Sequence, residues 1–149
     1  MKYSDLTQIV IGCAMKVHSK LGNGFQEVIY QRGMVIEFNR AKVSFSREHD
    51  MPIYYDQHHI GTRRVDFLVE GIISVELKAL LLLEPAHYAQ ARNYLEAYDL
   101  EVGLLLNFGA KSLQYKRFEN SKYKPSQGPT LSEFQNPHHP LIPPSPRSD

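Results

Sequence analysis

The chain of 149 residues is long enough to fold as one domain with a hydrophobic core. Its net charge of +1 gives no general attraction for nucleic acid or a membrane, although a local basic patch can still bind DNA. The single cysteine, Cys13, excludes an intrachain disulfide and is typical of a reducing compartment. No apolar run approaches the roughly 20 residues that cross a bilayer, and the N-terminus lacks a signal-peptide pattern. We therefore expect a cytoplasmic protein that does not enter a membrane.

The predicted elements begin with two helices. Apolar residues recur at helical spacing between residues 6 and 21, with Ser4 as a suitable N-cap and Gly22 as a terminator. A second helix is predicted over residues 25–39 and a third over residues 84–99. β-type segments cover residues 42–49, 51–56, 59–70, 72–80, 101–109 and 112–119. This order, with three or four strands before the third helix, predicts an α/β fold whose mixed sheet is flanked by helices.

The composition changes after about residue 121. Seven of the nine prolines lie from Pro125 onward, and no apolar periodicity accompanies them. This composition is typical of a segment without a packed core. We therefore expect a folded domain over residues 1–120 and a disordered tail over residues 121–149.

The segment RRVDFLVEGIISVELKAL predicts a hairpin whose register follows from its apolar residues. If Phe67 faces Val75, the connecting loop is Glu70-Gly71-Ile72, and opposed side chains share a face. The apolar face then consists of Val65, Phe67, Val69, Ile73, Val75 and Leu77. The other face places Asp66 opposite Glu76, with Lys78 two residues further along the second strand.

Two carboxylates opposed across a hairpin repel each other, and burial increases the cost. A divalent cation such as Mg²⁺ or Mn²⁺ would offset that repulsion, because hard cations prefer carboxylate oxygens and water as ligands. Lys78 could balance the charge, act on a metal-bound water or contact a phosphate. The alternative is an exposed face on which Glu76 forms a surface ion pair with Arg64 or Lys78.

Asp66, followed across the hairpin by Glu76-Leu77-Lys78, resembles the motif of the PD-(D/E)XK nuclease superfamily. The segment GFQEVIY, residues 24–30, is similar to the signature of the GxxExxY protein family, which itself resembles these nucleases. Residues 87–109 resemble a later block of that family. The resemblance extends from about residue 4 to 118 and implies a restriction-endonuclease-like core in the order α-α-β-β-β-α-β-β.

This resemblance implies a metal-dependent phosphodiester hydrolase that uses Mg²⁺ or Mn²⁺, with DNA rather than RNA as the expected substrate. The implied catalytic residues are Glu27, Asp66, Glu76, Lys78 and Gln90, and the implied metal ligands are Asp66, Glu76, the Leu77 carbonyl and Glu27. Lys78 would position the attacking water or stabilise the transition state. Substrate contacts are expected from Tyr30, which shares a helix face with Glu27, and from His87 and Tyr94, which share one with Gln90.

Basic residues supply the phosphate contacts that dominate nucleic-acid affinity. Arg63 and Arg64 precede the motif strand, and Lys116 and Arg117 lie in a basic segment. Of these, Arg64, Lys116 and Arg117 are the candidate substrate contacts. A solvated basic strand edge that discourages aggregation is the alternative for that segment. The rival function is an inactive nuclease-fold module that binds nucleic acid or a protein partner. A chain of this size has little room for a separate recognition domain, so sequence specificity is expected from a partner or a homodimer, or is absent. A third alternative is a structural oligomer built through residues 80–83.

Overall fold

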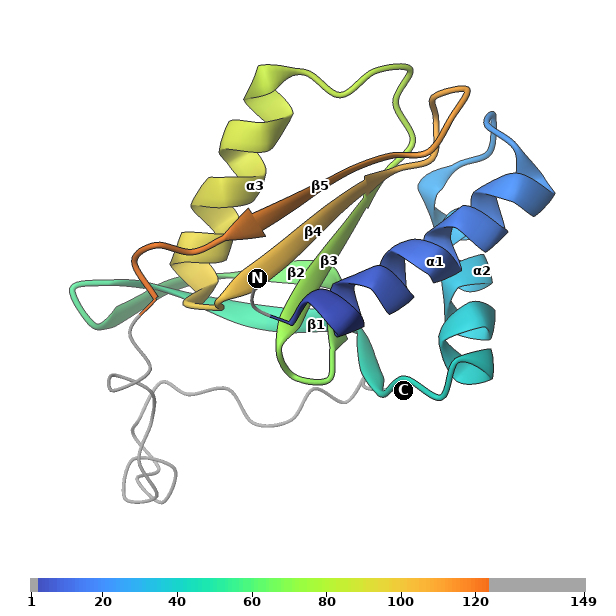
Figure 1. Cartoon of the computed structure of the whole chain (residues 1–149). Coiled ribbons are helices and arrows are strands. Elements are labelled where there is room, and N and C mark those ends of the chain that lie inside the picture. The colour runs from blue at the N-terminus through green and yellow to red at the C-terminus, as the bar shows by residue number, and fades with distance from the viewer. Residues whose placement is uncertain (1–2, 124–149) are drawn as a thin grey trace.

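The computed structural model describes residues 3–123, which form one mixed sheet with helices on both faces (Figure 1). The elements are α1 (Ser4–Leu21), α2 (Glu27–Arg40), β1 (Phe45–Tyr55), β2 (His58–Val69), β3 (Ile73–Lys78), α3 (Pro85–Tyr98), β4 (Val102–Asn107) and β5 (Gln114–Glu119). The sheet order is β1-β2-β3-β4-β5, in which β3 and β4 are parallel and the other neighbours are antiparallel. The predicted α/β class and element order are therefore confirmed.

Some predicted boundaries need correction. The first two β-type segments form a single strand, β1, which tolerates Pro52 because an edge strand pairs on one side only. The first helix begins at Ser4 itself, and Tyr3 occupies the N-cap position. The predicted tail lies outside the described residues except for residues 121–123. No helix within residues 3–123 combines the length and apolar character needed to cross a membrane.

The larger hydrophobic core lies between the sheet and the pair α1–α2. Its fully buried members include Tyr30, Phe38, Phe67 and Phe108. A β-carbon on Gly33 of α2 would lie only 3.0 Å from Val17 Cγ1 of α1, so the missing side chain lets the two helices pack closely. This core supplies most of the apolar burial that stabilises the fold.

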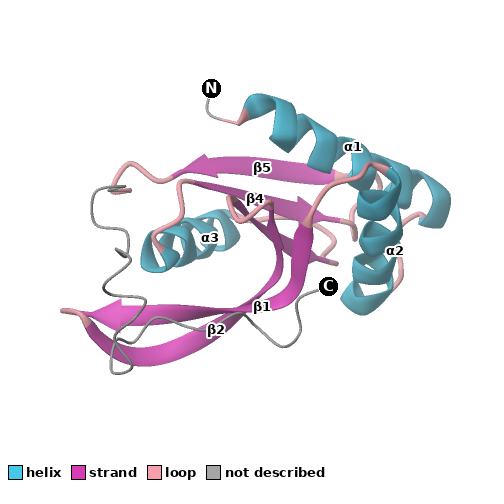
Figure 2. Cartoon of the chain, turned by 90° about the horizontal axis from the view of Figure 1, so that it is seen from below, coloured by secondary structure: helices cyan, strands magenta, loops and turns pink. Residues whose placement is uncertain are grey.

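The opposite face of the sheet carries α3 and two smaller apolar clusters. One consists of Leu83, Leu95, Leu105 and Phe118, and the other consists of Met51, Val65 and Tyr98. Strands β1 and β2 curve so that α3 lies between their far end and strands β4 and β5 (Figure 2). The curvature gives this side of the sheet a concave shape around α3.

The hairpin β2–β3 has the predicted register. Phe67 pairs with Val75, and Glu70 and Gly71 adopt the positive φ angles of 55° and 68° in the predicted loop. Val65 departs from the prediction, because it packs with Met51 and Tyr98 on the side of α3. The described β2–β3 pairs stop at Phe67–Val75, and β2 then curves away, so that strict alternation no longer keeps Val65 in the larger core.

Candidate active site

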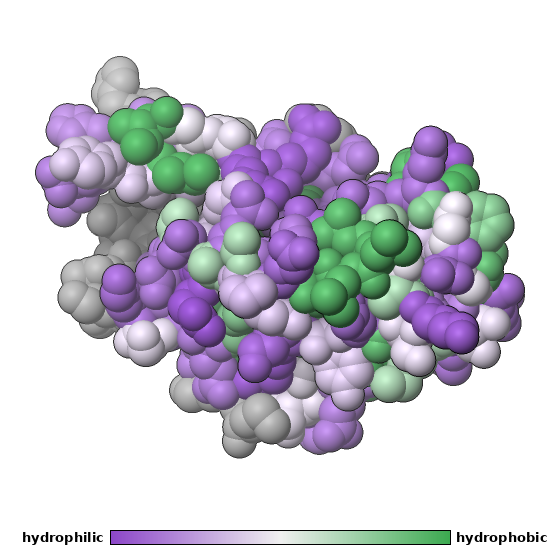
Figure 3. Space-filling view, turned by 90° about the horizontal axis from the view of Figure 1, so that it is seen from above, coloured by the Kyte–Doolittle hydropathy of each residue, from purple (hydrophilic) through white to green (hydrophobic). Residues whose placement is uncertain are grey.

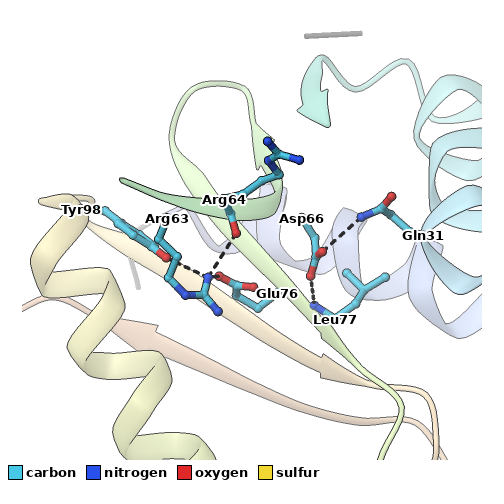
Figure 4. A network of polar contacts seen from close by, with 7 residues as sticks. All are labelled: Gln31, Arg63, Arg64, Asp66, Glu76, Leu77 and Tyr98. Carbon is cyan, nitrogen blue, oxygen red and sulfur yellow. Dashed lines mark hydrogen bonds and ion pairs between the residues drawn. The ribbon is translucent and has the colours of Figure 1, made fainter. Parts of the chain in front are cut away.

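The candidate site lies where β2 separates from β3, and Asp66 is its most firmly held residue. Asp66 Oδ2 accepts a hydrogen bond from the Leu77 N–H at 2.7 Å, and Oδ1 accepts one from Gln31 Nε2 at 3.1 Å (Figure 4). Gln31 is itself fixed, because its Oε1 accepts a hydrogen bond from Arg47 Nε at 2.9 Å. The carboxylate of Asp66 is thus anchored by both α2 and β3.

Glu76 forms an ion pair that the sequence did not predict. Its Oε1 lies 2.8 Å from Arg63 Nη1, and the Glu76 side chain is only 13% exposed. Arg63 Nη1 also donates to Tyr98 Oη at 3.0 Å, and the guanidinium lies 3.9 Å from the centre of the Tyr94 ring. The expected alternative partner, Arg64, instead pairs with Asp50 at 3.2 Å.

The acidic residues of the site influence one another electrostatically. Burial raises the pKa of Glu76 to about 7; Arg63 opposes the rise and Asp66 adds to it. Burial also raises the pKa of Asp66, against the hydrogen bonds from Leu77 and Gln31. Partial burial, followed by the charge of Asp66, raises the pKa of Glu27 at the start of α2. The structure therefore brings all three predicted carboxylates into one electrostatic cluster.

Lys78 belongs to the same cluster, because its charge opposes the pKa rise of Glu27, Asp66 and Glu76. Within the described residues, no hydrogen bond or ion pair engages its ammonium group. Its backbone is well fixed, because the Lys78 carbonyl accepts the Phe108 N–H at 2.8 Å. The ammonium group is therefore free to contact a ligand, although its attachment point is rigid.

The segment after Lys78 is held against the end of β4. Asn107 is fully buried, and its side chain accepts a hydrogen bond from the Leu80 N–H at 2.8 Å and donates one to the Leu80 carbonyl at 2.9 Å. A β-carbon on Gly109 would lie 2.4 Å from Leu80 N, so only glycine permits this close approach. Asn107 and Gly109 thus fix the path of the chain that leaves the lysine.

A shallow, open recess lies between β3 and α3; we call it the α3 recess. It is lined by Arg63, Glu76, Lys78, His87, Gln90, Ala91, Tyr94 and Leu105. The predicted stripe of His87, Gln90 and Tyr94 on α3 therefore faces the predicted residues of β3. His87 also closes the N-terminus of α3, because its Nδ1 accepts the Glu84 N–H at 2.9 Å.

Some predicted substrate contacts lie elsewhere. Tyr30 is fully buried; its hydroxyl donates to the Gly22 carbonyl at 2.6 Å, and its ring stacks on Phe108 at 4.7 Å. Arg117 pairs with Leu104 of the larger core, so the two share the α1–α2 face of the sheet. Neither residue lines the α3 recess.

Lys116, in contrast, lies on the same face of the sheet as Glu76. Lys116 pairs with Leu105, which in turn pairs with Glu76, and directly paired residues share a face. Two strand spacings place these residues about 10 Å apart. The exposed Lys116 therefore lies beside the recess and does not line it.

The donor chemistry of the cluster fits a hard divalent cation. Asp66 and Glu76 offer carboxylate oxygens, and the Leu77 carbonyl faces the same strand edge as the Leu77 N–H that contacts Asp66. Within residues 3–123, however, no three His, Cys, Asp or Glu side chains converge closely enough to hold a metal alone. A cation at this position would thus need the backbone oxygen and water as additional ligands.

The sequence did not single out Gln31, Tyr98 or Asn107, and it treated Arg63 only as a basic residue near the motif. A signal existed for Gln31, which lies one helical turn after Glu27 and shares its face. Strand alternation pointed Arg63 away from Glu76, and only the curvature of β2 brings them together. This curvature cannot be read from a pattern of apolar residues.

The mixed sheet, its flanking helices and the acidic cluster with a lysine on the central strands define a restriction-endonuclease-like protein. A sequence model described as PD-(D/E)XK nuclease superfamily matches residues 4–118. The chain belongs to this superfamily. Comparisons with curated proteins and with solved structures give no significant match.

Proposed function

We propose that the protein is a metal-dependent nuclease that hydrolyses phosphodiester bonds, with DNA as the preferred substrate and Mg²⁺ or Mn²⁺ as the cofactor. The observation that carries this proposal is the grouping of Asp66, Glu76 and Lys78 where β2 leaves β3, with the Lys78 ammonium unpaired among the described residues. Membership of the nuclease superfamily supports the same reaction class.

The chain's own residues have distinct tasks in this proposal. Asp66, Glu76 and the Leu77 carbonyl hold the cation, and Glu27 supports the cluster directly or through water. A cation held by these residues would supply a coordinated water of lowered pKa and positive charge for the phosphoryl oxygens. Lys78 orients the attacking water or stabilises the developing charge, a role suited to a free ammonium group on a fixed strand end.

Residues of α3 line the side of the recess where a substrate strand would lie. Because His87 Nδ1 accepts the Glu84 N–H, the neutral imidazole carries its proton on Nε2, which can donate to a phosphate oxygen. Gln90 is exposed at the same face and can donate through its amide. Lys116 and Arg64 extend the positive surface outward as phosphate contacts. We assign Tyr30 to the fold.

The decisive experiment is a cleavage assay on labelled single-stranded DNA, double-stranded DNA and RNA, with Mg²⁺, Mn²⁺ or EDTA. We expect cleavage with metal, none with EDTA, and a loss of about 10²-fold or more in Lys78→Met, the scale for removing one group that stabilises transition-state charge. Lys16→Met is the matched control, because Lys16 is exposed on α1 and distant from the recess. Its activity should equal that of the wild type.

The same assay separates an enzyme from a binding module. If the wild type binds labelled DNA but cleaves no substrate with either metal, the nuclease proposal fails and the non-catalytic module replaces it. If Lys78→Met retains full activity, cleavage takes place elsewhere on the molecule or comes from a contaminant. Melting curves of each variant show whether a loss of activity reflects loss of the fold.

A source of specificity outside the described domain is also part of the proposal. Leu81 and Leu82 are 87% and 59% exposed in the segment that joins β3 to α3, next to the recess. An apolar patch is visible on the surface viewed from above (Figure 3). A partner protein or a second copy that presents the DNA could contact this segment.

A further inference from the structure

Arg63 is held by an ion pair, a hydrogen bond and an aromatic ring. Among the ion pairs formed within residues 3–123, Arg63–Glu76 is the one in which both side chains are mostly buried, at 28% and 13% exposure. Its guanidinium also contacts the Tyr98 hydroxyl at 3.0 Å and lies over the Tyr94 ring at 3.9 Å. These three contacts place its positive charge directly on a proposed metal ligand.

Arg63 and a divalent cation cannot both be well accommodated at Glu76. The guanidinium lies 2.8 Å from Glu76 Oε1, so a metal bound to this oxygen would displace it, and a metal bound to Oε2 would share the carboxylate with it. Two cations at such a distance in a partly dry site repel strongly. Metal binding at Glu76 therefore favours the departure of Arg63 from the carboxylate.

The surroundings of Arg63 offer it a second position. Tyr94 lies on α3 and lines the α3 recess, so a guanidinium that keeps its place over this ring can turn its N–H groups into the recess. A guanidinium matches a phosphate group with two parallel hydrogen bonds. A substrate phosphate could therefore replace Glu76 as the partner of Arg63.

We propose that Arg63 is a counterion that exchanges partners: it pairs with Glu76 in the metal-free protein and with a substrate phosphate once a metal occupies Glu76. This inference rests on the proposed function, because it takes Glu76 as a metal ligand. It has two consequences. Arg63 lowers the metal affinity of the free protein, and it couples metal binding to phosphate binding, because each ligand relieves the cost of the other.

The first consequence is tested by calorimetric titration of the full chain with Mn²⁺ alone. We expect Arg63→Gln to bind Mn²⁺ about tenfold more tightly than the wild type, which corresponds to ~1.4 kcal/mol. Arg40→Gln is the matched control, because it removes the same charge from another arginine that pairs with a glutamate, Glu37, at 3.1 Å in the last turn of α2. Its Mn²⁺ affinity should equal that of the wild type.

A purely structural role predicts the opposite sign, because loss of Arg63 would then loosen Glu76 and weaken metal binding. Unchanged or weaker Mn²⁺ binding by Arg63→Gln, with normal binding by the wild type, overturns this inference and leaves the proposed nuclease intact. Absence of Mn²⁺ binding in the wild type and in both variants overturns the proposed function as well. If Arg63→Gln does not fold, Tyr98→Phe serves instead: it removes one anchor of Arg63 and should raise the Mn²⁺ affinity by a smaller factor.

The second consequence is tested by fluorescence anisotropy with a short labelled DNA duplex, in EDTA and in Ca²⁺, which limits cleavage during the measurement. In the wild type, Ca²⁺ should tighten DNA binding both by its own charge and by releasing Arg63. In Arg63→Gln only the first effect remains, so the ratio of the two dissociation constants should be several-fold smaller. Equal ratios in the two proteins would overturn the exchange of partners.

Discussion

The two faces of the sheet differ in what they bury. The face beneath α1 and α2 carries a continuous apolar core that contains aromatic rings from both helices and strands, including Phe38, Phe67 and Phe108. The face beneath α3 has two small apolar clusters, and beside them lie Arg63, Glu76 and Lys78 in the α3 recess. The first face secures the fold, and the second holds charges whose burial costs free energy.

The hairpin β2–β3 connects these two regions. Near its turn, Phe67 and Val75 form a regular pair that is fully buried on the α1–α2 side. One residue further, the Asp66 carboxylate, in place of a backbone carbonyl, accepts the hydrogen bond that the Leu77 N–H donates. A polar site can therefore open inside a sheet when the adjacent apolar pairs fix the strands.

We expect the largest loss of stability from a substitution in the α1–α2 core. Phe67 is fully buried and contacts Phe38 and Phe45 with ring centres 5.1 Å and 5.7 Å apart. Phe67→Ala should lower the free energy of unfolding by about 3–5 kcal/mol, because it removes a large side chain and leaves a cavity. Urea unfolding of Phe67→Ala and of Tyr94→Ala, the counterpart on α3, measures the contrast. A loss for Tyr94→Ala as large as that for Phe67→Ala would show that both faces secure the fold equally.

The next effect concerns the pH dependence of stability. Burial raises the pKa of Glu76 from its ordinary value of 4.5 to about 7, so the folded protein binds this proton more tightly than the unfolded chain. The free energy of unfolding is then highest while Glu76 is protonated and falls as the pH rises through this window. The raised pKa values of Asp66 and Glu27 act in the same direction. For Glu76 alone the fall is of the order of 3 kcal/mol.

Urea unfolding of the metal-free protein between pH 4.5 and pH 7.5 checks this prediction. Glu76→Gln should flatten the curve, because the amide has no proton to bind. Glu119→Gln is the control, since Glu119 is about half exposed on β5 and pairs there with Arg117. A flat wild-type curve would mean that the site holds its carboxylates at no cost, and the contrast between the two faces would lose its energetic basis.

Much of the difference between the two faces of the sheet can be predicted from the sequence, because the spacing of apolar residues along a strand or helix indicates which side chains are buried. The register of β2–β3 follows from its apolar alternation, and the stripe of His87, Gln90 and Tyr94 follows from helical spacing. The same register predicts that Asp66 and Glu76 lie near each other, and their charges do influence each other in the structure.

Other features depend on tertiary geometry that alternation does not encode. Val65 leaves the larger core and Arg63 reaches Glu76 because β2 curves, and this curvature comes from the whole hairpin. Tyr30 shares a helix face with Glu27 in the sequence pattern, yet its hydroxyl is used by the Gly22 carbonyl inside the core. A face of a helix is wide enough to hold both a buried and an exposed residue one turn apart.

The smallest predicted effect belongs to the outer rim of the α3 face. Lys116 is exposed on β5, on the same sheet face as Glu76 but about 10 Å away, so it can contact a phosphate without entering the recess. Lys116→Gln should leave the free energy of unfolding unchanged and reduce the slope of log affinity against log salt for DNA by about 1. Fluorescence anisotropy with a labelled DNA duplex at several salt concentrations, with EDTA present, measures this slope. Lys16→Gln on α1 is the matched control and should keep the wild-type slope, because its charge lies on the far side of the molecule.

If both variants reduce the slope equally, DNA contacts the protein over its whole surface, and the α3 face is not its specific binding side. If neither variant changes it, the phosphate contacts come from residues nearer the recess, where the ammonium group of Lys78 is available to a phosphate.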